Sequence, residues 1–228
     1  MIVRTTDYND AGAVIAEHLA AEYAELEAVL TAMPLNLKAS DQAGKQGTPI
    51  FDPVGTNAAI AEGLIARHWT AGHPIPAEFD FLGTDVDFVK NGLLVEAQFS
   101  NYPFLLNNVV RSELFFKAHT PLAGHSVRAV VIIAKAHMFD ASNSTLYYEQ
   151  AVKQLNSLAA NDVFDSPIRL VGLFERTDGT FNARFNEYHA ARYSRTLVKA
   201  TLRCANARAG RSADSRCRIE LGDEVRPS

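Results

Sequence analysis

Apolar residues recur at helical spacing through residues 11–33, with charged residues on the opposite face, and this pattern predicts one long amphipathic helix. Pro34 marks its end, because proline cannot continue a helix. Residues 35–57 contain many Gly, Pro and Asp residues, which predict a long ordered loop. A second helix is predicted over residues 57–69, where the sequence GHPIP follows and breaks it.

Strand and helix patterns alternate in the middle of the chain. Apolar runs predict strands at about 79–90, 93–99, 127–134 and 167–175, with helices near 103–119 and 145–160. Such interleaving is typical of an α/β fold in which helices flank both faces of a central mixed β-sheet. No internal repeat is present, and composition shifts only near residue 190. We therefore expect a single domain over residues 1–228 with a basic C-terminal tail.

The stretch VDFVKNGLLVEAQF, residues 86–99, predicts a β-hairpin that carries acidic residues. Its Asn-Gly sequence favours a two-residue type I′ turn, because both turn positions need a positive φ. The resulting register pairs Asp87 with Glu96 and Asp85 with Gln98. Side chains alternate along a strand, so these four residues are expected on one face. The other face is expected to enter the core through Val86, Phe88, Val95, Ala97 and Phe99.

Two carboxylates opposed across strands repel each other, so something should offset their charge. A divalent cation would do so, and two carboxylates with a backbone carbonyl and waters suit Mg²⁺. The alternative is an edge hairpin whose acidic face is simply solvated. The pattern alone leaves both interpretations open.

Charge is unevenly distributed around a net value of −4. Residues 1–30 carry one Arg against six acids, whereas residues 190–228 carry eight Arg and one Lys against four acids. The basic end could contact phosphates, but such tails are also common as solvated or disordered ends.

Several classes of protein are disfavoured by what the sequence contains. The N-terminus is not a signal peptide, and no apolar run approaches the roughly 20 residues of a membrane span, so we expect a cytoplasmic protein without membrane contact. Cys204 and Cys217 lack the spacing of a disulfide scaffold or a zinc site. The histidines show no ligand spacing, and without a GxSxG motif there is no case for a hydrolase triad.

An Asp on one strand followed by Glu-X-Gln on the next, here Asp87 and then residues 96–98, resembles the PD-(D/E)XK nuclease superfamily. The neighbouring segments narrow this likeness to one group of type II restriction endonucleases, over about residues 6–199. The segments that carry it are MPLNLKASDQAGKQG, IFDPVGTN, FDFLGTDVDF, QFSNYPFLLNNVVRSELF, HMFDASNSTLYYEQA and PIRLVGLFE.

The resemblance implies a homodimeric enzyme with a restriction-endonuclease-like core that cuts double-stranded DNA at AGATCT after the first A, leaving four-base 5′ overhangs. A DNA methyltransferase of the same system would protect the host. By position, Asp87 and the Ala97 carbonyl would hold Mg²⁺ together with Glu96, which would also orient or deprotonate the attacking water. Gln98 replaces the usual lysine and cannot offer positive charge. Asp85 is open to either a structural role or direct ligation.

The same resemblance suggests DNA-reading residues. Ser100-Asn101 and Asn143-Ser144 match recognition segments, since hydroxyls and amides can pair with base edges. Helix capping is the alternative for both pairs. Tyr193 and Arg195 would also touch DNA, although each could contact phosphate alone.

Three departures from the group bear on activity. Gly72, with His73 beside it, stands where the group has an asparagine, and Asp140 stands where it has a proline in the recognition loop. The tail from about Ala200 does not match. These departures motivate an alternative, a catalytically impaired DNA-binding protein of the same fold. A phosphohydrolase acting on small molecules is a third hypothesis, which the recognition segments disfavour.

Overall fold

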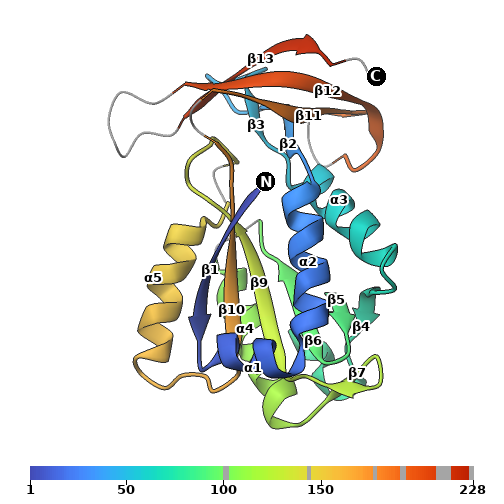
Figure 1. Cartoon of the computed structure of the whole chain (residues 1–228), viewed down its shortest axis with the longest axis vertical. Helices are drawn as coiled ribbons and strands as arrows, with labels where there is room; N and C mark the ends of the chain where they lie inside the picture. Colours follow the sequence, from blue (N-terminus) through green and yellow to red (C-terminus); the bar gives the residue numbers. More distant parts are fainter. Residues whose placement is uncertain (100–102, 143–144, 177–178, 191–193, 209–216, 226–228) are drawn as a thin grey trace.

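The computed structural model describes the chain apart from residues 100–102, 143–144, 177–178, 191–193, 209–216 and 226–228 (Figure 1). Its larger sheet is mixed, as predicted: β10, β9 and β6 are parallel, and the outer strands are antiparallel to their neighbours. In spatial order its strands are β1 (Ile2–Tyr8), β10 (Ile168–Phe174), β9 (Ala129–Lys135), β6 (Leu93–Ala97), β5 (Asp85–Lys90) and β4 (Thr70–Pro74).

Helices cover both faces of this sheet, which confirms the predicted α/β class. One hydrophobic cluster packs α1 (Ala11–His18), α2 (Ala20–Ala32) and α3 (Pro53–Ile65) against one face. A second cluster packs α4 (Phe104–Lys117) and α5 (Tyr148–Ala159) against the other. Strand β9 contributes side chains to both clusters, because successive residues point to opposite faces: Val131 lies in the first cluster and Ile132 in the second.

The predicted single helix over residues 11–33 is wrong, because α1 and α2 are separated at Leu19. Leu19 leaves the helical conformation, with φ −138° and ψ 22°. Its side chain is buried in the same cluster as Ile15 and Leu26. The apolar spacing therefore continues across the break, and the sequence pattern does not reveal it.

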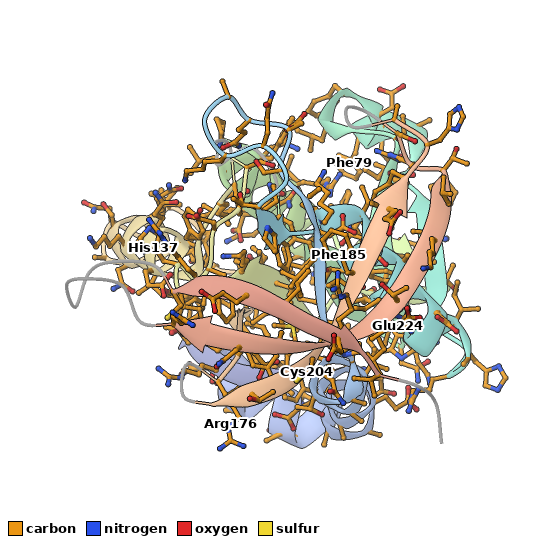
Figure 2. The ribbon with its side chains drawn as sticks, turned by 90° about the horizontal axis from the view of Figure 1, so that it is seen from above. Phe79, His137, Arg176, Phe185, Cys204 and Glu224 are labelled. Atoms are coloured by element: carbon orange, nitrogen blue, oxygen red, sulfur yellow. The ribbon has the colours of Figure 1, made fainter. Side chains whose placement is uncertain are left out.

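A second, five-stranded sheet lies across one end of the molecule (Figure 1), and Figure 2 views it from above. This sheet corrects one expectation, because residues 35–57 are not one loop. It also shows that the basic end contains two strands within its described residues, 197–208 and 218–224. Helix α3 also begins at Pro53 rather than at residue 57. The strands in spatial order are β13 (Arg218–Glu224), β12 (Leu197–Arg208), β11 (Thr180–Tyr188), β2 (Leu35–Ala39) and β3 (Pro49–Phe51).

Smaller elements complete the fold. The strand expected at 79–90 starts only at Asp85, because residues 77–82 form a 3₁₀ helix, η1 (Ala77–Leu82). Two short strands, β7 (Pro121–Leu122) and β8 (His125–Ser126), make a separate hairpin. The first hydrophobic cluster contains Val131 of the larger sheet and Ala183 and Ala205 of the second, while the single-domain expectation stays a prediction. None of the helices in the described ranges is long and apolar enough to cross a membrane.

Candidate active site

The β5–β6 hairpin has the predicted turn, but it follows the predicted register only near that turn, and the predicted pairs Asp87–Glu96 and Asp85–Gln98 are not part of its ladder. Asn91 and Gly92 both have positive φ, 49° and 92°, and the ladder pairs Lys90 with Leu93 and continues to the pair Phe88–Val95. Beyond that pair the two strands no longer form a ladder. Instead, the Asp87 Oδ2 atom accepts a hydrogen bond of 2.7 Å from the Ala97 backbone N–H. Asp87 is therefore tied to the strand that carries Glu96, at the point where the strands separate.

Burial decides between the two interpretations of the acidic face. Glu96 is 3% exposed and Gln98 is 7% exposed, because they share the face of Leu94, which α4 and α5 cover. The solvated-face alternative is thus wrong for these residues, while Asp85 is exposed and Asp87 half-buried. Val86 was expected beside Phe88 but packs in the cluster of Leu94. It lies past the last β5–β6 ladder pair, where β6 no longer constrains the alternation of β5.

Two residues of α4 that the sequence analysis did not identify reach this site. The Arg111 guanidinium donates to Glu96 Oε1 at 2.5 Å and to Asn108 Oδ1 at 3.3 Å, both from Nη2. Asn108 Nδ2 in turn donates to Gln98 Oε1 at 3.1 Å. Arg111 and Asn108 are each 6% exposed. A charged residue on the buried face of a predicted helix was the signal available in the sequence, since arginine is rarely buried without a partner.

Gly83 allows Arg111 to take this position. Arg111 Nη1 donates to the Asp85 carbonyl oxygen at 3.0 Å, close to the end of η1. A Cβ atom at Gly83 would lie only 3.0 Å from the same nitrogen. Gly83 also has φ +134°, which side chains other than glycine rarely adopt. The glycine in the sequence FLGTDVD therefore helps to form the site.

Burial of this pair makes ionisation of both carboxyl groups less favourable than it is in water. Burial raises the pKa of Glu96 to about 8; Arg111 opposes this shift and the charge of Asp87 adds to it. Burial also raises the pKa of Asp87, against the hydrogen bond from Ala97. A bound cation would favour the ionised forms of both groups.

The donor set fits a hard divalent cation. Carboxylate oxygens and a backbone carbonyl are the ligands that Mg²⁺ and Ca²⁺ prefer, and Mg²⁺ commonly keeps several waters and takes only one or two carboxylates. Within the described ranges no three His, Cys, Asp or Glu residues gather as a complete metal cluster. A site formed by Asp87, Glu96 and the Ala97 carbonyl would therefore need water or substrate oxygens to complete it.

Most of the predicted DNA-reading residues, namely Ser100, Asn101, Asn143, Ser144 and Tyr193, lie outside the described residues. Arg195 is exposed just before β12. With Arg184 and Tyr188 it lines a cavity of about 200 Å³ beside α3. The structure thus places Arg195 at the second sheet, whereas the carboxylates belong to the larger one.

The two departures near the site have defined surroundings. Gly72 lies in β4 between the residues that pair with Val86 and Phe88, and a Cβ atom there would meet nothing within 4 Å. The neighbouring His73 accepts a 3.0 Å hydrogen bond from the Ala123 backbone through Nε2.

Asp140 lies 3.5 Å from the Lys45 ammonium, measured from Oδ2. Its backbone carbonyl accepts a 2.9 Å hydrogen bond from the Phe51 N–H. The extra acid therefore has a cation from the segment between β2 and β3 beside it, which offsets part of its charge.

Known proteins match this chain closely. The family model described as restriction endonuclease BglII/BglIII matches residues 3–173. The type II restriction enzyme BglII of Bacillus subtilis is 54% identical over 199 residues, which cover 87% of this chain and 88% of that enzyme.

Two solved structures of the same kind also match. A crystal structure of restriction endonuclease BglII complexed with a DNA 16-mer has a TM-score of 0.93 and 48% identity, covering 97% of this chain and all of that one. A crystal structure of free BglII has a TM-score of 0.76 and 46% identity, with the same coverage. Restriction endonucleases of this kind generally use a divalent metal ion. The chain belongs to the BglII/BglIII family of restriction endonucleases and is a type II, site-specific deoxyribonuclease.

Proposed function

We propose that the enzyme cuts both strands of AGATCT after the first A with Mg²⁺ as its metal, through Asp87, Glu96 and Gln98. The observation that carries the proposed active site is the convergence of two carboxylates with raised pKa at the place where β5 and β6 separate. The proposed DNA sequence rests on the likeness to BglII, which extends over most of the chain.

The ion would be held by Asp87, the Ala97 carbonyl and Glu96. When bound, it would stabilise negative charge on the phosphate and lower the pKa of a bound water. Asp87 is oriented for this role by its hydrogen bond to the Ala97 N–H.

The protein groups would orient the reactants. Glu96 has one oxygen held by Arg111, so its other oxygen can accept a hydrogen bond from the attacking water and remove its proton. The water oxygen would then bond to phosphorus as the bond between phosphorus and the leaving sugar oxygen breaks, and that oxygen would take a proton from solvent. Gln98 would donate a hydrogen bond to the phosphate or to the water.

The DNA partner is proposed to be read by the Ser100-Asn101 and Asn143-Ser144 pairs, with Tyr193 and Arg195 adding contacts. The similar enzyme solved with a DNA 16-mer supports a duplex partner. Asn143→Ala should weaken binding to AGATCT by roughly 1–3 kcal/mol and scarcely change non-specific binding. Equal weakening of cognate and random duplexes in a titration would show that Asn143 reads no base.

A homodimer would match the two-fold symmetry of the palindrome and place one active site on each strand. Exposed apolar side chains on α4 support an interface there, since Phe104, Leu106 and Val110 are 47–50% exposed. The species in solution should have a mass of about 50 kDa by sedimentation, twice the 24.9 kDa chain. Such an enzyme would act in the cytoplasm beside a methyltransferase that protects host sites.

The experiment that tests the function is digestion of a plasmid of known sequence with Mg²⁺, followed by run-off sequencing of the cut ends. Ends at A^GATCT with four-base 5′ overhangs would support the proposal. Cuts at a different sequence would refute the proposed specificity and leave the nuclease assignment intact. Specific binding without cutting would instead favour the catalytically impaired alternative.

A further inference from the structure

The side chains behind the catalytic carboxylates form a chain of hydrogen bonds whose direction is fixed. An arginine has only donors, so Arg111 can be only the donating end. It donates to Glu96 Oε1 and Asn108 Oδ1. Because the Asn108 carbonyl oxygen is turned to Arg111, its NH₂ group faces Gln98 and donates to Gln98 Oε1.

This direction determines which end of the Gln98 amide is bonded to Asn108. Its carbonyl oxygen accepts from Asn108, so its NH₂ group is the end that donates to other partners. Gln98 is thereby oriented as a hydrogen-bond donor. A lysine, the residue usual at this position in the superfamily, also has only donors. The hydrogen-bond chain makes an ambiguous amide behave with the polarity of a lysine.

We propose that Asn108 and Arg111 are positioning residues that fix Gln98 as a donor toward the scissile phosphate or its attacking water. In addition, Arg111 places behind Glu96 the positive charge that an amide at position 98 lacks. This inference rests on the catalytic role proposed above for Gln98. Neither Asn108 nor Arg111 touches the DNA in this scheme, since each acts through another side chain.

Burial makes the orientation persistent. Glu96, Gln98, Asn108 and Arg111 are all less than 8% exposed, so water cannot readily replace a lost partner. A reversed Asn108 amide would face Arg111 with its NH₂ group and lose that hydrogen bond, and Gln98 could then bond to Asn108 only by reversing its own amide. Buried polar groups without partners are costly, so the reversed state is disfavoured. Packing of α4 alone would be served equally well by apolar residues at these positions.

A polarity exchange tests the proposal. Asn108→Asp can only accept, so it cannot hold the Gln98 oxygen, and the cleavage rate constant should fall at least tenfold. Gln98→Lys alone should lower the cleavage rate constant by a similar factor, because the Asn108 NH₂ group then faces an ammonium group. In the double variant, which combines Asn108→Asp with Gln98→Lys, an acceptor at position 108 again faces a donor at position 98. Its rate should exceed the product of the two single effects by at least tenfold, which corresponds to about 1.4 kcal/mol of coupling.

Controls separate orientation from folding. Asn107→Asp makes the same chemical change one position away on α4, where Asn107 Nδ2 donates only weakly to the Leu82 carbonyl at 3.3 Å, and it should cleave as the wild type does. Each variant should still show a cooperative melting transition and bind duplex DNA in Ca²⁺, and Asn107→Asp should keep the melting temperature of the wild type. If Asn108→Asp does not fold, Gln98→Glu serves as a second test. It keeps an acceptor for Asn108 but removes the donor at position 98, so its cleavage rate constant should also fall at least tenfold.

The outcomes distinguish this inference from the proposed function. Near-wild-type cleavage by Asn108→Asp or Gln98→Glu, or simple multiplication of the single effects in the double variant, would overturn the positioning role while the nuclease mechanism stands. Cleavage that persists in Gln98→Ala would instead remove the catalytic role of Gln98 itself.

Discussion

Two buried carboxylates in this molecule have opposite surroundings. Asp52, which is fully buried, caps α3 at the junction of the second sheet with that helix. Its side chain accepts hydrogen bonds from three neutral donors in the described part of the chain: the Val54 N–H at 3.1 Å, Asn186 Nδ2 at 2.8 Å and the Tyr188 hydroxyl at 2.6 Å. Glu96, in contrast, is bonded to a cation, Arg111, and lies close to a second acid.

The difference separates a carboxylate buried for structural reasons from carboxylates buried at the candidate active site. Neutral donors and a helix N-terminus satisfy Asp52 within the chain, so it stabilises the fold without needing a ligand. Glu96 and Asp87 share one arginine and have raised pKa, so their ionised pair is completed only when further positive charge arrives. Burial and charge alone do not distinguish the two kinds of site; the distinction is whether donors within the chain satisfy the carboxylate, as they do for Asp52 and not for the Asp87–Glu96 pair.

The largest expected effect is on the cleavage rate, when one carboxylate charge is removed at the candidate active site rather than at the α3 cap. Asp87→Asn should lower the cleavage rate by more than about 100-fold, because it removes a proposed metal ligand. Specific duplex binding in Ca²⁺ should be retained. The matched variant Asp52→Asn should cleave at a rate within a few fold of wild type but unfold at lower urea concentration. If Asp87→Asn retains more than about a hundredth of the wild-type rate, Asp87 is not the principal metal ligand.

Crowding the Asp52 cluster should affect stability alone. A Cβ atom at Gly55 would lie 2.1 Å from Asn186 Nδ2 and 2.5 Å from Asp52 Oδ2. Gly55→Ala should therefore lower the free energy of unfolding by about 3 kcal/mol in urea titration. The control is Gly222→Ala, where the nearest contact would be an ordinary 3.5 Å. Equal stability of the two variants would contradict the tight packing inferred around Asp52.

Removing one neutral donor should have a smaller effect. Tyr188→Phe deletes the hydroxyl that donates to Asp52, leaving that oxygen with Asn186. The expected loss is about 1–2 kcal/mol of unfolding free energy, measured by urea titration. Because burial and the bond to Asp52 raise the pKa of Tyr188, its hydroxyl stays a donor at neutral pH. An unchanged midpoint would mean that water replaces the hydroxyl.

A pH dependence of stability is also expected in the metal-free enzyme. Burial raises the pKa of folded Glu96 from 4.5 to about 8, so between these values the folded state holds a proton that the unfolded state has released. Stability from this group is therefore present below about pH 4.5 and is lost as pH rises toward 8. Glu96→Gln should reduce the fall in melting temperature across this window. An identical slope in both proteins would contradict the raised pKa.

Local sequence determined the elements that form the active-site hairpin. The Asn-Gly turn fixed the register up to Phe88–Val95, and period-two alternation placed Glu96 and Gln98 on one face. The predicted helix over residues 103–119 was also confirmed as α4. The catalytic roles proposed for residues in this hairpin came from their likeness to a nuclease family, because acids in a hairpin are not specific by themselves.

Tertiary structure decided what covers that face and which distant segments meet. Helix α4 brings Arg111 onto Glu96, and β2 pairs with β11, whose residues come nearly 150 positions later, as in the contact between Asn36 and Asn186. The break at Leu19 likewise depends on packing in a shared core. Turn dihedrals and side-chain alternation are set by neighbouring residues, so sequence reveals them. Pairing and burial between distant segments depend on the free energy of the whole fold, so sequence periodicity does not reveal them.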